Sequence, residues 1–444
     1  MMTLYTKGTA VDKLWKIFFS YFSKQTRPTA RHLFELVLSL FALNGYRSVR
    51  FFYEHFIRNI SNNSLTSYYY ALNESKIDLQ DWLEKLSSAA LDIIPSQFSE
   101  YPIVLAIDDT MVEKFGTSFE CRSCLFDHAS HNGSNYLNGH CFVSLLMHVP
   151  VSGFQYLPVP LGYRMWDKSQ SKLDMAANLV RTAMESIGTE RPVILCCDSW
   201  YPKGAICDLI QEYKNLTLIC NVRSDTVLYD LPPEKNGKRG RPRKKGKRIT
   251  VQQIPLSDVP RTDYSAGAMP VKTNLFGDRI VTAIVTKAKK GNSVRLFLST
   301  QSAEQLSFPL DFLRQESAVV YPQTNPALLP LAIYSLRWNI EVSYYEQKTF
   351  WGFGAYMLQS KTGVERLVNL LSLVFSALIL LPFQSQEFSA LKGQSPQEIR
   401  FILGQLVQQQ VFLTAFDAHT KSENISRYME NYLIQVVSSL ACAA

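Results

Sequence analysis

Residues 334–348, YSLRWNIEVSYYEQK, concentrate side chains that could do chemistry. Read as an α-helix at about 100° per residue, the stretch places five polar side chains on one stripe: Tyr334, Arg337, Glu341, Tyr345 and Lys348. Four apolar side chains form the opposite stripe, which can face a protein core: Leu329, Ile333, Leu336 and Ile340. One carboxylate among cations and phenols suits an acid that binds a metal ion while its neighbours hold phosphates. The alternative reading is the exposed charged face of an ordinary helix.

Three more acids stand at the ends of apolar runs that read as strands. Asp108 and Asp109 lie in YPIVLAIDDT, and Asp198 follows RPVILCC. A lone aspartate at a strand end is usually a turn or cap residue, but acids on two neighbouring strands together with Glu341 form a rarer pattern. Their oxygen-only chemistry favours Mg²⁺ or Mn²⁺ over zinc. Two such ions about 4 Å apart can activate an attacking oxygen and stabilise the leaving one in phosphodiester displacement.

The elements that must position these acids follow an informative order between residues 101 and 224. Three apolar runs with short turns predict an antiparallel meander, after which helix, strand, helix and strand follow. This is the order of the ribonuclease-H-like fold. Residues 225–320 contain shorter β-like pieces, including ITVQQIP, and the chain returns to helix at Pro326. The expected class is α/β: a ribonuclease-H-like core interrupted by a β-rich insertion, with helical N-terminal and C-terminal regions.

The same pattern divides the chain into five segments. They are a helical DNA-binding domain at 1–98, the first part of the core at 99–224, the insertion with a basic loop at 225–322, the second part of the core with the third acid at 323–385, and a helical region at 386–444. The first segment gathers six side chains suited to DNA: Arg47, Arg50, Arg58, Tyr68, Tyr69 and Tyr70. Two helices, a polar turn and a third helix fit DNA reading. A small bundle whose tyrosines pack inward fits equally well.

Positive charge is concentrated in one run. The chain of 444 residues has 46 basic and 38 acidic residues, a net charge of +8. Nine Lys or Arg and no acid lie between Lys235 and Arg248, so subtracting nine leaves −1 for the rest. A single basic run on an otherwise near-neutral protein indicates that one segment of the chain contacts an anionic partner. We expect DNA contacts from five of its members, although a solvated charged loop is the alternative: Arg239, Arg241, Arg243, Lys244 and Lys245.

Other features of the sequence indicate the cellular compartment of the protein. Eight cysteines without even spacing fit a reducing cytosol, and the N-terminal residues show no secretion signal. Residues 367–383 approach membrane length but contain three polar side chains and Pro382, so a buried core helix is expected and no membrane span. One group has the ligand types for zinc, although its loops are too short for the usual finger: Cys121, Cys124, His128 and His131.

Taken together, these motifs resemble the DDE transposases of bacterial insertion sequences. In one group of that family the third acid lies in a Tyr, Arg, Glu, Lys helix motif with two, three and six residues between its members. Four residues match this spacing without a gap: Tyr334, Arg337, Glu341 and Lys348. IDDT at 107–110 and DSWYPKG from Asp198 resemble the first and second acid motifs. The resemblance covers about residues 30–385.

The resemblance implies a metal-binding catalytic triad of Asp108, Asp198 and Glu341 with two Mg²⁺ or Mn²⁺ ions. Asp109 stays open as the alternative to Asp108. Three cationic or phenolic side chains would hold the transposon end near the cleaved phosphate: Tyr334, Arg337 and Lys348. The implied activity is metal-dependent cleavage and cut-and-paste strand transfer of double-stranded DNA. The implied assembly is a homodimer bound to terminal inverted repeats and target DNA in the cytoplasm of a bacterium, at the nucleoid.

Two rival functions are compatible with the same residues. One is a related nuclease that cuts DNA without integrating it, and the other is a DNA-binding repressor whose acids are only structural. Some relatives stack a tryptophan of the insertion on a flipped base, but no Trp lies between Trp200 and Trp338. Either this stacking is missing from the protein or one of three other aromatic residues takes it over: Tyr229, Tyr264 or Phe276.

Overall fold

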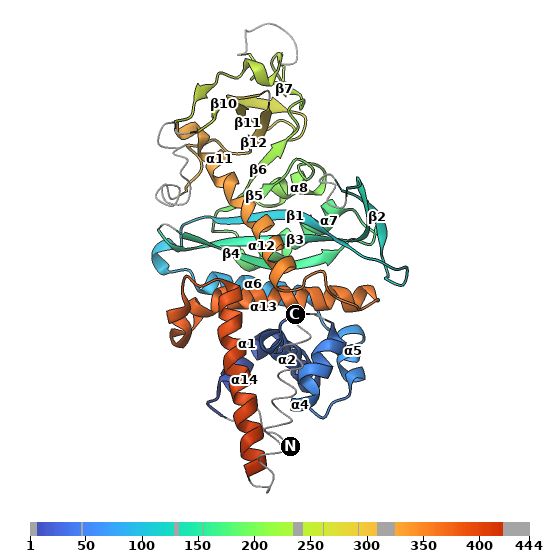
Figure 1. Ribbon diagram of the computed structural model, residues 1–444. Coiled ribbons are helices and arrows are strands. Elements are labelled where there is room, and N and C mark those ends of the chain that lie inside the picture. Colours follow the sequence, from blue (N-terminus) through green and yellow to red (C-terminus); the bar gives the residue numbers. More distant parts are fainter. Residues whose placement is uncertain are drawn as a thin grey trace. The chain divides into compact units, whose positions relative to one another are not determined.

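The computed structural model describes residues 7–45, 48–127, 133–153, 155–233, 243–260, 262–291, 293–308 and 325–420. The chain forms two compact units, each built from separate stretches of sequence. The first unit comprises Met1–Leu86, Met111–Cys141 and Tyr344–Ala444, and the second comprises Ser87–Thr110 and Phe142–Ser343. The first unit is mostly helical, whereas the second contains most of the sheet (Figure 1).

The sheet of the second unit follows the order predicted from the apolar runs. Its first five strands are β1 (Ile103–Glu113), β3 (Tyr136–Ser152), β4 (Gln155–Met165), β5 (Val193–Cys197) and β6 (Leu216–Val222). β4 pairs antiparallel with β3, β3 neighbours β1, and β1, β5 and β6 are parallel. The predicted helices are α7 (Lys172–Ile187) and α8 (Ala205–Glu212). A mixed α/β fold is therefore confirmed.

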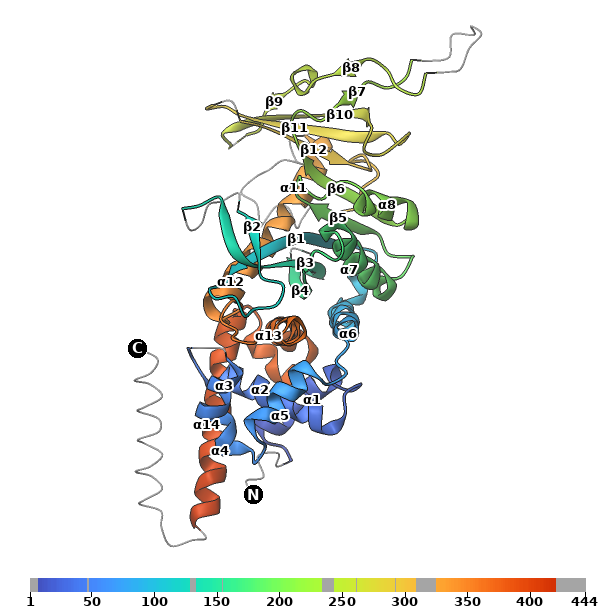
Figure 2. The same ribbon diagram turned by 90° about the vertical axis from the view of Figure 1, so that its right-hand side faces the viewer.

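Six further strands follow β6 in sequence. They are β7 (Leu228–Tyr229), β8 (Arg248–Ile249), β9 (Ser257–Asp258), β10 (Tyr264–Thr273), β11 (Val281–Ala288) and β12 (Val294–Ser299). β12 pairs antiparallel with β6, so these strands continue the same sheet (Figure 2). The prediction of a strand across ITVQQIP is wrong beyond Ile249. Thr250 there begins a 3-10 turn through reciprocal hydrogen bonds with Gln253, which remove these backbone groups from strand pairing.

The segment with the third acid is not one continuous helix. It consists of the 3-10 turn Pro326–Leu328, α11 (Leu329–Tyr334), the 3-10 turn Ser335–Arg337 and α12 (Trp338–Phe350). The tight turn has a local cause, since the Ser335 hydroxyl donates a 2.6 Å hydrogen bond to the carbonyl of Ala332.

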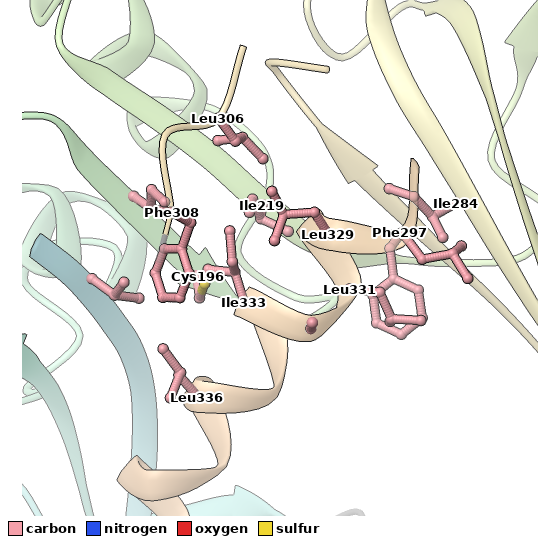
Figure 3. Packing of buried hydrophobic residues seen from close by; sticks show 14 of the residues in the cluster. Cys196, Ile219, Ile284, Phe297, Leu306, Phe308, Leu329, Leu331, Ile333 and Leu336 are labelled. Carbon is pink, nitrogen blue, oxygen red and sulfur yellow. The ribbon is translucent and has the colours of Figure 1, made fainter. Parts of the chain in front are cut away.

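The apolar stripe predicted for this segment is buried as expected. Ile333 and Leu336 belong to a core cluster with Cys196 of β5 and Ile219 of β6, and Leu331 lies beside Phe297 of β12 (Figure 3). Burying such side chains stabilises the fold by roughly 2 kcal/mol each. This packing fixes the segment against the sheet and thereby sets the positions of its polar side chains.

Helices dominate the first unit. They are α1 (Ala10–Tyr21), α2 (Arg27–Ala42), α3 (Val49–Phe52), the π-helical stretch Tyr53–Ile57, α4 (Arg58–Ile60), α5 (Leu65–Asn73), most of α6 (Leu79–Asp92), α13 (Lys361–Gln384) and α14 (Pro396–Thr420). Strand β2 (Ser123–Phe126) pairs there with the first residues of β3.

Helix α13 contains the apolar stretch of near-membrane length. Among the described residues it is the one helix long and apolar enough to cross a membrane, and 83% of its apolar window is buried within the protein. It packs against α5 and α14. The prediction of a buried core helix is confirmed for this stretch.

The tyrosines of α5 differ in orientation, so some fit an inward-packed helical bundle and others fit a DNA-binding surface. Tyr68 is buried, and its hydroxyl donates a hydrogen bond to the buried carboxylate of Glu35 in α2. Tyr70 is 62% exposed, and Arg50 is also exposed. Arg47 lies outside the described residues. Inward packing thus accounts for Tyr68, and a DNA-binding role for the outward-facing residues stays a prediction.

Candidate active site

The register of two parallel strands brings the first and second acids together. Ile107 of β1 is paired with Cys197, the last residue of β5. Asp108 and Asp198 are therefore each one residue beyond the same pair. Residues in matching positions of parallel strands project to the same face of a sheet. The backbone thus places both carboxylates side by side at one edge of the strand pairing.

Strand alternation also separates Asp108 from its neighbour Asp109. Val104 and Ile194, which share the face of Asp108 and Asp198, pack in the core cluster with α11. Asp109 projects to the other face, where α7 lies (Figure 2). The side chains of Asp108 and Asp109 consequently lie in two different environments, one on each face of the sheet.

Arg337 links the first acid to the third. Its Nη1 donates a 2.7 Å hydrogen bond to Asp108 Oδ2, and its Nη2 donates to Glu341 Oε1 at 3.3 Å. The guanidinium carbon lies 5.8 Å from the centre of the Tyr334 ring, which itself packs edge-on against Phe297. The Arg337 side chain is only 13% exposed. Three of the four residues of the Tyr, Arg, Glu, Lys motif therefore form one connected group.

The charges of Asp198 and Glu341 both act on Asp108. Burial raises the pKa of Asp108 well above its ordinary range; Arg337 opposes this shift, and Asp198 and Glu341 add to it. Burial also raises the pKa of Asp198, against the hydrogen bond from the Trp200 backbone N–H. Burial disfavours the charge of Arg337, but the surrounding phenol and carboxylates raise its pKa above the usual value.

This balance of charge fits a divalent cation. Three carboxylates face one guanidinium, so the ionised group is left with two negative charges in a largely buried place. Carboxylate oxygens are ligands that Mg²⁺ and Mn²⁺ accept. Within the described ranges, no three His, Cys, Asp or Glu side chains are arranged closely enough to hold one ion as they stand. The Arg337 guanidinium lies between the carboxylates of Asp108 and Glu341. A metal ion in that place would be bound by oxygens of both residues.

Asp109 is fully engaged in a separate ion pair. Lys172 Nζ of α7 donates to its two carboxylate oxygens at 3.0 and 2.9 Å, and the Tyr201 hydroxyl donates to Oδ1 at 2.9 Å. Nothing in the sequence pattern pointed to Lys172. Tyr201 lies within the DSWYPKG motif, but its partner could not be read from that motif. Asp109 therefore contacts Lys172 and Tyr201, whereas Asp108 contacts Arg337.

A cavity of about 850 Å³ adjoins the second acid. Its lining combines Asp198 with polar and aromatic side chains from β6, β10, β12 and the third-acid segment: Asn221, Tyr264, Arg295, Phe297 and Trp338. Of the three aromatics predicted to stack on DNA, Tyr264 lines this cavity. Phe276 is buried elsewhere, and Tyr229 lies 4.9 Å from the Lys245 ammonium.

The remaining predicted DNA contacts are Lys348 and the members of the basic run. Lys348 is exposed, and its Nζ donates to the Met111 carbonyl at 2.9 Å. Arg243 is exposed, and Lys244 forms an ion pair with Asp278. Four predicted residues lie outside the described ranges: Arg239, Arg241, His128 and His131. Cys121 and Cys124 are the other half of the zinc hypothesis; Cys121 is half-buried and Cys124 is exposed.

A buried histidine that sequence reasoning left unassigned connects the strands to α12. His148 Nδ1 donates to the Val104 carbonyl at 3.1 Å, and its Nε2 accepts a 3.1 Å hydrogen bond from the Asn339 amide. This arrangement requires the neutral ring. Complete burial lowers the pKa of His148 to about 4. Asn339 precedes Glu341 by two residues, so His148 helps to position the third acid.

The histidine predicts a pH dependence of stability. As the pH falls, the unfolded chain binds a proton at His148 near pH 6.5, but the folded protein does so only near pH 4. We therefore expect the protein to lose roughly 3 kcal/mol of stability between these values. Urea unfolding of the wild type and His148→Gln across this range measures the effect. Equal pH slopes in the two proteins would show that the folded histidine titrates normally.

Comparison with known families agrees with this geometry. The model of the family described as DDE superfamily endonuclease matches residues 18–269, more than half of the chain. The match contains Asp108 and Asp198 and ends before Glu341. A search of curated proteins found no match. The extent of the family match shows that this chain belongs to the DDE superfamily endonucleases.

Proposed function

We propose that the protein is a DNA transposase of the insertion-sequence group with the Tyr, Arg, Glu, Lys motif. Membership of the DDE endonucleases implies a metal-dependent nuclease or transposase that acts on DNA. The observation that carries the proposal is that Arg337 contacts both Asp108 and Glu341, while Asp198 stands at the strand end next to Asp108. In this proposal, the strand order β4-β3-β1-β5-β6 is a ribonuclease-H-like core, and β7 to β12 are the insertion that extends it.

The catalytic acids would be Asp108, Asp198 and Glu341, which together would hold two Mg²⁺ or Mn²⁺ ions. When bound, such ions activate the attacking oxygen and stabilise the leaving oxygen of a phosphodiester. The parallel register of β1 and β5 fixes two of these acids on backbone that is buried on both sides. Rigid placement matters because small displacements of reacting groups cost large factors in rate.

The cationic side chains would act on the DNA itself. Arg337 neutralises the acids in the free protein, and we propose that it transfers to a phosphate near the cleaved bond. Tyr334 holds the guanidinium in place through its ring. Lys348, Arg243 and the basic run around it would bind phosphates further along the duplex, with the salt dependence typical of such contacts. The cavity at Asp198 has room for a nucleotide, with Tyr264 in its wall.

The larger organisation of the enzyme is part of the same proposal. Residues 1–98 would be the helical DNA-binding domain, with core segments at 99–224 and 323–385, the insertion at 225–322 and a helical region at 386–444. Two copies would assemble on the terminal inverted repeats of the element, cut it out and join it to target DNA. The enzyme would work in the bacterial cytoplasm, at the nucleoid.

Strand transfer separates a transposase from a simple nuclease. Purified protein is incubated with Mg²⁺, a labelled fragment carrying the DNA that flanks the gene, and a supercoiled plasmid as target. A transposase cuts at the repeat ends and links the label to the plasmid. Cleavage without labelled plasmid would establish the nuclease instead. Binding of the repeats without any cleavage would support a repressor and refute the catalytic proposal.

A further inference from the structure

A series of lysines and tryptophans extends from the second acid along the second unit. The ammonium groups of Lys172 and Lys203 each lie 4.4 Å from the centre of the Trp200 ring. Lys172 also lies 5.6 Å from the Trp166 ring, and Lys168 lies 5.7 Å from it. We call these five side chains the Lys–Trp ladder. Its order in space is Lys168, Trp166, Lys172, Trp200, Lys203.

The ladder is tied to the active site at one end and is held in a defined shape. The backbone N–H of Trp200 donates a 3.0 Å hydrogen bond to Asp198 Oδ1. The Trp200 ring packs edge-on against Tyr201, whose hydroxyl binds Asp109. At the other end, the Trp166 indole N–H donates to the Gln170 carbonyl at 3.0 Å. Both indoles are thus fixed before any ligand arrives.

The ladder carries positive charge at its two ends. The charge of the central Lys172 is balanced by Asp109. Lys168 and Lys203 are exposed, and neither forms an ion pair with an acid of the described part of the chain. An ammonium over an indole face keeps its charge, because the interaction is electrostatic attraction to the ring. Trp200 is 37% exposed, so part of its ring also faces solvent.

From this arrangement we propose that the Lys–Trp ladder binds the phosphate backbone of DNA on its way to Asp198. Lys168 and Lys203 make the phosphate contacts, and Trp200 is a positioning residue that holds the Lys203 ammonium beside the second acid. The inference rests on the proposed function, because it places the ladder next to a DNA-cleaving site. It adds a DNA contact in the loop that follows Asp198, separate from the contacts proposed for Arg337.

The test measures how DNA affinity depends on salt. An end-labelled duplex of mixed sequence is titrated by fluorescence anisotropy in EDTA, which prevents cleavage, between about 50 and 200 mM salt. Loss of one phosphate contact makes the negative slope of log K against log salt shallower by about 0.9. The decrease in affinity across this salt range is then about threefold smaller than for the wild type. We expect this change for Lys203→Ala and for Lys168→Ala, and we expect Lys203→Arg to retain the wild-type slope.

A matched control flanks the same helix, since Lys203 precedes α8 and Lys214 follows it. Lys214, exposed just beyond the other end of α8, should be replaceable by alanine without any change in slope. Trp200→Leu leaves every lysine in place, so it should weaken binding several-fold at each salt concentration, and Trp200→Phe should recover most of that loss. A merely structural tryptophan would alter the melting temperature without this recovery of affinity.

The outcomes separate the ladder from the catalytic proposal. Equal slopes for Lys203→Ala, Lys168→Ala and the wild type would overturn the ladder, whether or not the wild type cleaves DNA. A reduced slope in a wild-type background that never cleaves DNA with Mg²⁺ would keep the ladder and refute the catalytic proposal. Equal slopes for Lys203→Ala and Lys214→Ala, both reduced, would show general surface charge and also overturn the ladder.

Discussion

Replacing Asp108 with asparagine is expected to abolish Mg²⁺-dependent cleavage, with a loss of at least about 10³-fold in rate. The carboxamide keeps the size of the side chain but removes the charge that a divalent ion needs. Metal-ion catalysis contributes several kcal/mol to such reactions, and each 1.36 kcal/mol is about a factor of ten. Cleavage of end-labelled DNA by purified enzyme measures the loss. DNA affinity, measured in parallel by anisotropy, should remain near that of the wild type.

Asp109→Asn is the matched control, because it makes the same chemical change one residue further along β1. Asp109 binds Lys172 and Tyr201, and it projects to the other face of the sheet. We expect this variant to lose roughly 1 to 3 kcal/mol of stability and to keep most of its cleavage activity. The reverse result, an active Asp108→Asn and an inactive Asp109→Asn, would show that the metal ligand had been assigned to the wrong residue.

The strands that position the acids could be predicted because their physical signal is local. Apolar runs bounded by turn residues identify β1, β3, β4, β5 and β6, and a helical period identifies α7 and α8. The chain order of these elements was then enough to expect Asp108 and Asp198 at neighbouring strand ends. Short-range periodicity also located the buried stripe of Ile333 and Leu336, since one helical face must meet the core.

The identity of the first ligand could not be predicted, because it depends on register. A one-residue shift between β1 and β5 would exchange the faces of Asp108 and Asp109. The observed pairing of Ile107 with Cys197 places Asp108, rather than Asp109, on the face of Asp198. The partner of Asp109 was equally hidden, because Lys172 is 63 residues further along the chain and belongs to an otherwise ordinary amphipathic helix.

The direction of Arg337 was also beyond sequence reasoning. A cation on the polar stripe of a helix is expected to reach outward to phosphate, yet this guanidinium turns inward to Asp108 and Glu341. Two features make the difference. The 3-10 turn at Ser335–Arg337 changes the helical phase, and the buried carboxylates need a countercharge in the free protein.

Replacing Arg337 with methionine should accordingly destabilise the free protein by about 3 kcal/mol or more. Methionine fills similar space but leaves the buried carboxylate of Asp108 without its positive partner, and breaking a buried ion pair in this way typically costs about 3 to 5 kcal/mol. Added Mg²⁺ should recover part of this loss, because an ion that binds only the folded state stabilises it. Urea unfolding in EDTA and in excess Mg²⁺ measures both effects.

Two variants test whether the stability effect comes from the charge at this position. Arg337→Lys keeps the charge but lacks the planar fork that reaches both acids, so its stability should fall between those of the wild type and Arg337→Met. Lys348→Met removes an exposed cation of the same motif and should leave unfolding nearly unchanged, with or without Mg²⁺. If Mg²⁺ stabilised the wild type and Arg337→Met by equal amounts, the guanidinium and the metal would not occupy one electrostatic site. The three acids would then need another explanation for their convergence.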